Sequence, residues 1–197
     1  EVSVTSIYVT HDRDEAFAMA DRLIFMNHGR IVQTGTPEEV VADPADGFVA
    51  RSLGFKNILR GVVRSDGEVL DIECSVGVFS VPKPPDLKTA KRAELILLID
   101  EKGIAISALP SGEAATSSSL KGMITERMFR GDRYEIRVQI GQGELYCHAS
   151  ADADTTLIRR GQHVAVSINP AAIRFLGDQD QSPCNGSIGS SLGQSEQ

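Results

Sequence analysis

Apolar and polar residues alternate one by one through residues 134–140 and 164–169. This period of two places successive side chains on opposite faces of a strand, and it is typical of antiparallel sheets with one buried and one solvated face. It predicts that Ile136 and Val138 point into a core. Because Gly-containing turn signals separate such runs, residues 58–177 are predicted to form a small all-β barrel.

The first 57 residues change their period several times. The β-branched and aromatic run at residues 5–10 predicts a buried strand, and residues 12–20 predict a helix with acidic residues in its first turn. Two short apolar runs, residues 23–26 and 31–33, flank a loop that contains Gly. This arrangement is typical of a β-hairpin.

Two more helices are expected in this part of the chain. Thr36 provides an N-cap hydroxyl, a proline follows it, and Glu39 completes the pattern of a capping box. A last short helix is predicted at residues 48–53, where Gly54 provides a stop.

Small polar residues dominate two stretches of the sequence. Residues 110–119 are predicted to be a surface loop or short linker, and residues 178–197 a loose tail, because neither stretch has enough apolar surface to form a core. The predicted units are therefore residues 1–57, a barrel at 58–177 and a tail at 178–197. The expected fold class is α+β overall.

Composition excludes several kinds of protein. With 20 Lys and Arg against 27 Asp and Glu, the net charge of −7 disfavours a dedicated nucleic-acid binder. The longest aliphatic run, residues 95–99, is far short of the ~20 residues that span a bilayer. Cys74, Cys147 and Cys184 show no metal-ligand or paired spacing, which indicates a reduced, cytosolic compartment.

The first 57 residues carry a series of spaced motifs. They are Ile7-Tyr-Val-Thr-His-Asp12, Asp14-Glu-Ala16, Met19-Ala-Asp-Arg22, Gly29-Arg-Ile31, Gly35-Thr-Pro-Glu38 and Phe48-Val-Ala50. This series resembles the end of an ABC-transporter ATPase domain, most closely that of importers for sugars, polyamines, iron or oxyanions. The resemblance implies that residues 1–57 are the remnant of an α/β ATPase domain, and the Glu1 start, without a Met, led to the same expectation of a fragment.

The barrel segment resembles the OB-like TOBE regulatory domain that these ATPases carry. Two features support the resemblance: Phe129-Arg-Gly-Asp132 matches the family's Gly-Asp turn, and Asn169-Pro-Ala-Ala-Ile173 matches its closing segment. Residues 99–104 stand where the family has a segment with an Arg-Pro pair, which this sequence lacks.

His11 is the candidate catalytic residue. In the family this "switch" histidine contacts the γ-phosphate of ATP and helps to hold the attacking water, a task that an imidazole at the end of a strand suits. The resemblance therefore implies a role for His11 in the complete subunit only. His28, His148 and His163 have no partners at ligand spacing and are interpreted as structural or surface residues.

Other ATPase motifs are missing from the sequence. There is no G-x-x-x-x-G-K-[ST] loop and no Leu-Ser-Gly-Gly-Gln signature. The aliphatic run that ends in Asp100-Glu101 has the form of a Walker B strand, but it follows His11 instead of preceding it and is rejected. The chain alone is therefore expected to be inactive and without a cofactor, whereas the complete subunit would use ATP and Mg²⁺.

The resemblance also implies partners and a location. We expect a homodimer of ATPase subunits that contacts membrane permease subunits, lies in the cytoplasm at the inner face of the membrane, and binds no nucleic acid. The barrel is expected to be the regulatory and dimerising part.

An alternative from another class is a free-standing OB-type module that binds an oxyanion such as molybdate, or single-stranded nucleic acid. Its support is the one net-positive segment, residues 121–177, whereas the small number of aromatic side chains available for stacking argues against nucleic acid. The arginines of this segment are Arg127, Arg130, Arg133, Arg137, Arg159, Arg160 and Arg174. A solvated barrel face explains them more simply.

Overall fold

The structure, a computed structural model, describes residues 5–109, 119–151 and 158–177. The predicted tail at 178–197 and all but Ser119 of the predicted loop at 110–119 lie outside the described residues.

The N-terminal unit contains the predicted helices and hairpin. Helix α1 (Arg13–Met19) precedes the hairpin of β1 (Leu23–Asn27) and β2 (Arg30–Gly35), and α2 (Pro37–Ala42) and α3 (Gly47–Ser52) follow. The hairpin turn places His28 and Gly29 at φ 48° and 76°, which is the left-handed geometry that a tight hairpin requires. The capping box is confirmed, because Thr36 and Glu39 each bond the other's backbone N–H.

The prediction of a buried strand at residues 5–10 is wrong for this chain. The segment is extended but joins no sheet, and the side chains of Ile7 and Val9 are 88% and 90% exposed. The reason is the lack of a partner, since β1 and β2 pair only with each other among the described residues. An apolar run forms a stable strand only when a neighbour satisfies its backbone and covers its side chains.

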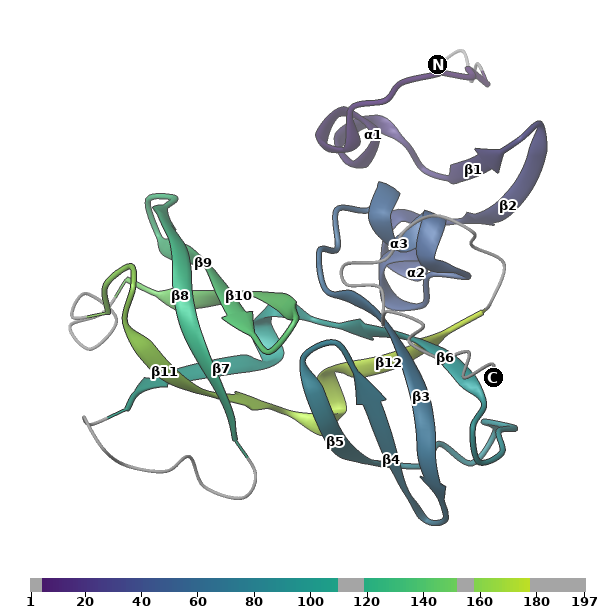
Figure 1. The fold of residues 1–197 in the computed structure, drawn as a ribbon. Coiled ribbons are helices and arrows are strands. Elements are labelled where there is room, and N and C mark those ends of the chain that lie inside the picture. The colour runs from purple at the N-terminus through teal and green to yellow at the C-terminus, as the bar shows by residue number, and fades with distance from the viewer. Residues whose placement is uncertain (1–4, 110–118, 152–157, 178–197) are drawn as a thin grey trace, which may run out of the picture.

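The rest of the described chain forms two curled antiparallel sheets (Figure 1). The first barrel sheet has the order β12-β6-β3-β4-β5 and the second has the order β10-β9-β8-β11-β7. The strands of the first are β3 (Ile58–Asp66), β4 (Val69–Cys74), β5 (Gly77–Pro82), β6 (Glu94–Ile99) and β12 (Ile173–Leu176). Those of the second are β7 (Ile104–Ala108), β8 (Leu120–Phe129), β9 (Arg133–Ile140), β10 (Gly143–Ser150) and β11 (His163–Ile168).

The chain crosses between the two sheets twice, each time through a short 3-10 turn. The turn η1 (Glu101–Gly103) joins β6 to β7, and η2 (Pro170–Ala172) joins β11 to β12. The turns bond each other, since Asp100 N donates to Ala172 O at 3.0 Å and Asn169 N donates to Gly103 O at 2.9 Å. A Cβ on Gly103 would lie 2.0 Å from the Ala172 Cβ, so this close approach depends on glycine.

One hydrophobic core contains side chains from both sheets. Ile136 and Val138 are buried in it, as the alternation predicted, and so are the free thiols of Cys74 and Cys147. The described part of the chain is therefore mostly β. Within that part, no helix has the length and apolar character needed to cross a bilayer.

The N-terminal unit packs on the first barrel sheet through α3. Ala50 lies against Ile58, Leu98 and Leu176, and Phe55 contacts both this cluster and the small core of the N-terminal unit. In Figure 1, α3 lies next to the barrel, while α1 and the β1–β2 hairpin lie farther out.

Candidate functional site

Helix α1 begins directly after His11. The Asp12 carboxylate caps the helix by accepting from the backbone N–H groups of Asp14 at 2.8 Å and Glu15 at 3.1 Å. An aspartate is well suited to this position because it satisfies free donors and complements the positive end of the helix. The carboxylate of Asp12 is therefore committed to the local fold.

A second set of hydrogen bonds fixes the approach to His11. The Thr10 hydroxyl accepts from Asp12 N at 2.9 Å and donates to Glu15 Oε2 at 3.0 Å. The Tyr8 hydroxyl donates to the same carboxylate oxygen at 3.4 Å. His11 is thus held between two residues that are both bonded to the first turn of α1.

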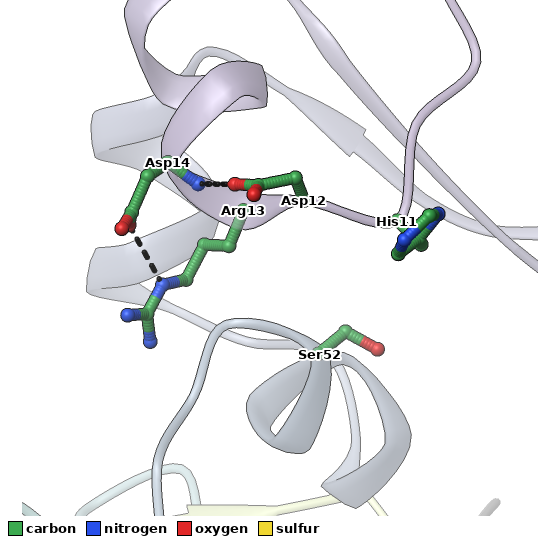
Figure 2. Close-up of a pocket in the computed structure, with 5 residues that line it drawn as sticks. All are labelled: His11, Asp12, Arg13, Asp14 and Ser52. Carbon is green, nitrogen blue, oxygen red and sulfur yellow. Dashed lines mark hydrogen bonds and ion pairs between the residues drawn. The ribbon is translucent and has the colours of Figure 1, made fainter.

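The His11 imidazole itself is exposed, and the structure shows no hydrogen-bond or ion-pair partner for it in the described part of the chain. Together with Asp12, Arg13, Asp14 and Ser52 it lines an open, mostly polar hollow. Figure 2 shows the ring on the opposite side of Asp12 from the Arg13–Asp14 pair. Its nitrogens are therefore available to a ligand or to a neighbouring part of a longer protein.

Arg13 has contacts that the sequence did not indicate. Its Nη1 donates to Leu53 O, at the end of α3, at 3.1 Å, and its Nε pairs with Asp14 Oδ1 at 3.3 Å. The side chain therefore connects the helix after His11 to the segment that leads into the barrel.

The hollow does not supply what ATP and Mg²⁺ need. Across the described residues there is no group of three or more His, Cys, Asp and Glu side chains that could hold a metal ion. The carboxylate of Asp12, which also lines the hollow, already accepts two backbone hydrogen bonds. Among the described residues, the hollow therefore offers one exposed imidazole but no set of side chains for a metal ion.

The other histidines lie elsewhere. His28 is exposed in the hairpin turn, His163 is exposed at the start of β11, and His148 is half-buried on β10. None of them lines the hollow at His11.

A polar junction lies where the start of β3 meets the second barrel sheet. The buried amide of Asn57 accepts from Tyr146 N and donates to Tyr146 O, both at 2.7 Å, so it satisfies one position on the edge of β10. Lys56 Nζ pairs with Glu135 Oε2 at 3.3 Å, and Lys56 N donates to Glu101 Oε1 at 3.2 Å.

The two carboxylates of this junction differ in their pKa. Burial of Glu101 raises its pKa, and the N–H of Lys56 and the nearby charges only partly offset that effect. For Glu135 desolvation also favours the neutral form, but Lys56 and Arg130 outweigh it and lower its pKa. Burial, with a smaller effect from the negative charge of Glu101, raises the pKa of the Cys147 thiol on β10 to about 12.

Five of the seven arginines in residues 121–177 have separate partners. Arg130 pairs with Glu135, Arg133 with Asp132, and Arg137 with both Glu126 and Glu144. Arg127 lies over the Tyr134 ring at 3.6 Å. Arg174 Nη1 donates to Val41 O at 2.8 Å and Ala42 O at 2.6 Å, at the end of α2.

Comparison with known proteins finds a matching domain model and relatives that are import ATP-binding proteins. A family model described as "TOBE domain" matches residues 101–176, which comprise the second barrel sheet, both crossings and β12. The spermidine/putrescine import ATP-binding protein PotA of Acetivibrio thermocellus is 32% identical over 181 residues, which are 89% of this chain and 45% of that protein. The Fe(3+) ions import ATP-binding protein FbpC of Streptomyces coelicolor is 37% identical over 138 residues, covering 70% of this chain and 35% of that protein.

A solved structure matches the barrel. The cytoplasmic molybdate-binding protein ModG, determined with molybdate bound, superimposes with a TM-score of 0.52 and 16% identity, covering 62% of this chain and 96% of that one. At this identity the match shows a similar fold only.

The chain spans less than half the length of these curated relatives. The similarity between this chain and these relatives extends over most of this sequence, whereas the TOBE domain model matches only its C-terminal part. The chain therefore contains a TOBE domain in residues 101–176 and is homologous over most of its length to the ATP-binding subunits of ABC importers.

Proposed function

We propose that this chain is the C-terminal part of the ATP-binding subunit of an ABC importer for a small solute such as a sugar, polyamine, iron or an oxyanion. The observation that carries the proposal is the similarity to import ATP-binding proteins over 89% of the chain, in a region that includes a TOBE domain. The relatives' substrates are spermidine, putrescine and Fe(3+), and they do not single out one solute for this chain.

In this proposal residues 1–57 are the end of the α/β nucleotide-binding domain and residues 58–177 are the regulatory barrel. His11 provides one contact to the terminal phosphate or to the attacking water. The exposed imidazole, for which the structure shows no hydrogen-bond or ion-pair partner among residues 5–109, 119–151 and 158–177, supports this role, as do the hydrogen bonds of the neighbouring Thr10 and Asp12. ATP, Mg²⁺ and the remaining catalytic groups belong to the complete subunit.

The proposed partners follow from the same family. Two ATPase subunits form a homodimer, to which the barrel contributes, and they contact membrane permease subunits at the cytoplasmic face of the membrane. No role in nucleic-acid binding is proposed, and the net charge of −7 supports that choice.

The alternative, a free-standing OB-type module for molybdate or single-stranded nucleic acid, has weaker support. Its structural argument is the similarity of fold to ModG at 16% identity. Five of the seven arginines that could attract an anion are paired with carboxylates, a ring or backbone carbonyls at separate places: Arg127, Arg130, Arg133, Arg137 and Arg174.

The proposal is tested by replacing His11 with Ala in the complete ATP-binding subunit. We expect ATP turnover to fall roughly 10²-fold, because a positioned hydrogen-bonding group in the transition state is lost, while nucleotide binding changes little. His28→Ala, in an exposed turn of the same unit, is the matched control and is expected to keep wild-type turnover. Normal hydrolysis by His11→Ala would show that His11 has no catalytic part.

A further inference from the structure

Arg13 connects two parts of the molecule that are far apart in the sequence. It is the first residue of α1, two positions after His11, and its Nη1 donates to the carbonyl of Leu53, 40 residues later, at 3.1 Å. Asp14 holds the same guanidinium through Nε at 3.3 Å. The side chain is therefore oriented from both sides.

The backbone at Gly54 is shaped for this contact. Gly54 has a φ of +89°, and a Cβ at this position would lie 1.7 Å from Arg13 Nη1. Glycine is thus needed both for the left-handed conformation and for the approach of the guanidinium. By contrast, Gly29 also has a positive φ, of +76°, but a Cβ there would meet nothing within 4 Å.

The segment at Leu53 and Gly54, which Arg13 contacts, also packs against the barrel. Gly54 is followed by Phe55, whose N–H donates to Ala50 O at 3.1 Å and whose ring packs against both the N-terminal core and the first barrel sheet. From β12, the Arg174 guanidinium lies 5.0 Å from the centre of that ring. A displacement of β12 would therefore move the segment at Leu53 and Gly54.

We propose that Arg13 is a positioning residue for His11, and that its contact with Leu53 and Gly54 transmits the placement of the barrel to the catalytic histidine. The inference rests on the proposed function, since it gives His11 its catalytic part. Asp12 caps α1, and Arg13 is the next residue, so a shift of the guanidinium moves the first turn of α1 and with it the backbone that carries His11.

The first test compares kcat and KM for ATP in the complete subunit. Arg13→Ala is expected to lower kcat about 10-fold with an unchanged KM, because a misplaced catalytic group affects the reacting geometry more than nucleotide binding. Arg13→Lys keeps a donor for the Leu53 carbonyl and is expected to restore part of kcat. Gly54→Ala is expected to lower kcat as well, and Gly29→Ala, which has the same backbone strain without the contact, is expected to leave it unchanged.

The second test is a double-mutant cycle between Arg13 and the barrel. Arg174→Ala removes the anchor on Phe55 and is expected to lower kcat severalfold when Arg13 is present, but to have no further effect in the Arg13→Ala background. Arg133→Ala, whose partner is the neighbouring Asp132, is the matched control on the barrel. Additive effects of Arg13→Ala and Arg174→Ala, or a normal kcat in Arg13→Ala, would overturn the inference.

The result for His11→Ala separates this inference from the proposed function. A normal kcat in His11→Ala removes the catalytic role that the proposed function gives to His11, and it overturns the positioning role of Arg13 as well. A large loss in His11→Ala with a normal kcat in Arg13→Ala leaves the proposed function in place and overturns only the positioning role of Arg13.

Discussion

Glu101 is a carboxylate buried where the two barrel sheets meet. It accepts a hydrogen bond from Lys56 N and lies near the charges of Lys56 and His148, while Asp100 repels it. Desolvation by burial has the largest effect on the pKa of Glu101 and raises it above the ordinary value of 4.5. The ionised form of Glu101 therefore costs the folded protein stability at neutral pH.

This cost leads to a prediction about pH. Because the pKa of Glu101 is higher in the folded than in the unfolded chain, the folded state binds the proton more tightly, and stability is lost as the pH rises from about 4.5 through the raised value. Glu101→Gln keeps an oxygen for Lys56 N without the charge. We expect its Tm to equal that of the wild type near pH 4 and to exceed it by a growing margin as the pH rises toward 8.

Thermal unfolding across this pH range is the measurement. The exposed Glu68 supplies the control, since Glu68→Gln should show a constant small difference from the wild type at every pH. A constant difference for Glu101→Gln as well would contradict the assignment of the pH dependence to Glu101.

At the residue scale, local signals could be predicted from the sequence and distant contacts could not. The capping box at Thr36 and the place of His11 before a helix depend on neighbours within a few residues. Arg13 and Asn57 have partners 40 and 89 residues away, and nothing in their immediate surroundings indicates those partners. Their roles became visible only when the fold brought the segments together.

The start of β3 is attached to the edge of β10 by one side chain. The Asn57 amide bonds both Tyr146 N and Tyr146 O at 2.7 Å, and its Nδ2 also donates to Ile99 O at 3.3 Å. It therefore takes the place of a neighbouring strand at this position of the edge, where unpaired groups are costly.

We expect Asn57→Ala to lower the free energy of unfolding by about 2 to 4 kcal/mol, because buried backbone groups lose their partners. Asn169→Ala is the matched control. Asn169 caps η2 through one hydrogen bond of 3.0 Å in an exposed position, so its loss should be about 1 kcal/mol. Denaturant unfolding measures both, and equal losses would mean that the Asn57 amide has no special part in joining the sheets.

At the scale of elements, too, features that depend on nearby residues could be predicted from the sequence, and features that depend on distant residues could not. The hairpin of β1 and β2 was predicted because its turn and both strands lie within residues 23–35. Residues 5–10 do not form the predicted strand. Their apolar pattern indicates that a strand is possible, but it does not show whether a neighbouring strand is present to pair with them. The alternation in the barrel predicted which side chains are buried, yet it contained no information on the two crossings at η1 and η2.

At the scale of the whole molecule, the described strands of the barrel and the N-terminal unit differ in how they bury their apolar side chains. The two barrel sheets share one core, whereas Ile7, Val9 and Met19 of the N-terminal unit are left largely exposed. On the hairpin, Ile24, Met26 and Ile31 are also more than half exposed. Such a concentration of exposed apolar side chains is unusual for a free surface and fits a unit that packs against further protein.

The central claim, that residues 1–57 are the end of a nucleotide-binding domain, is tested most directly by amide hydrogen exchange at residues 5–10. In the isolated chain these amides lie in an exposed segment outside any sheet, and we expect them to exchange rapidly. In the complete ATP-binding subunit we expect the same amides to become strongly protected, since the segment gains neighbouring strands, while the β3–β6 pairing of the barrel keeps its protection in both. Equally rapid exchange at residues 5–10 in the complete subunit, or slow exchange there in the isolated monomer, would contradict the claim.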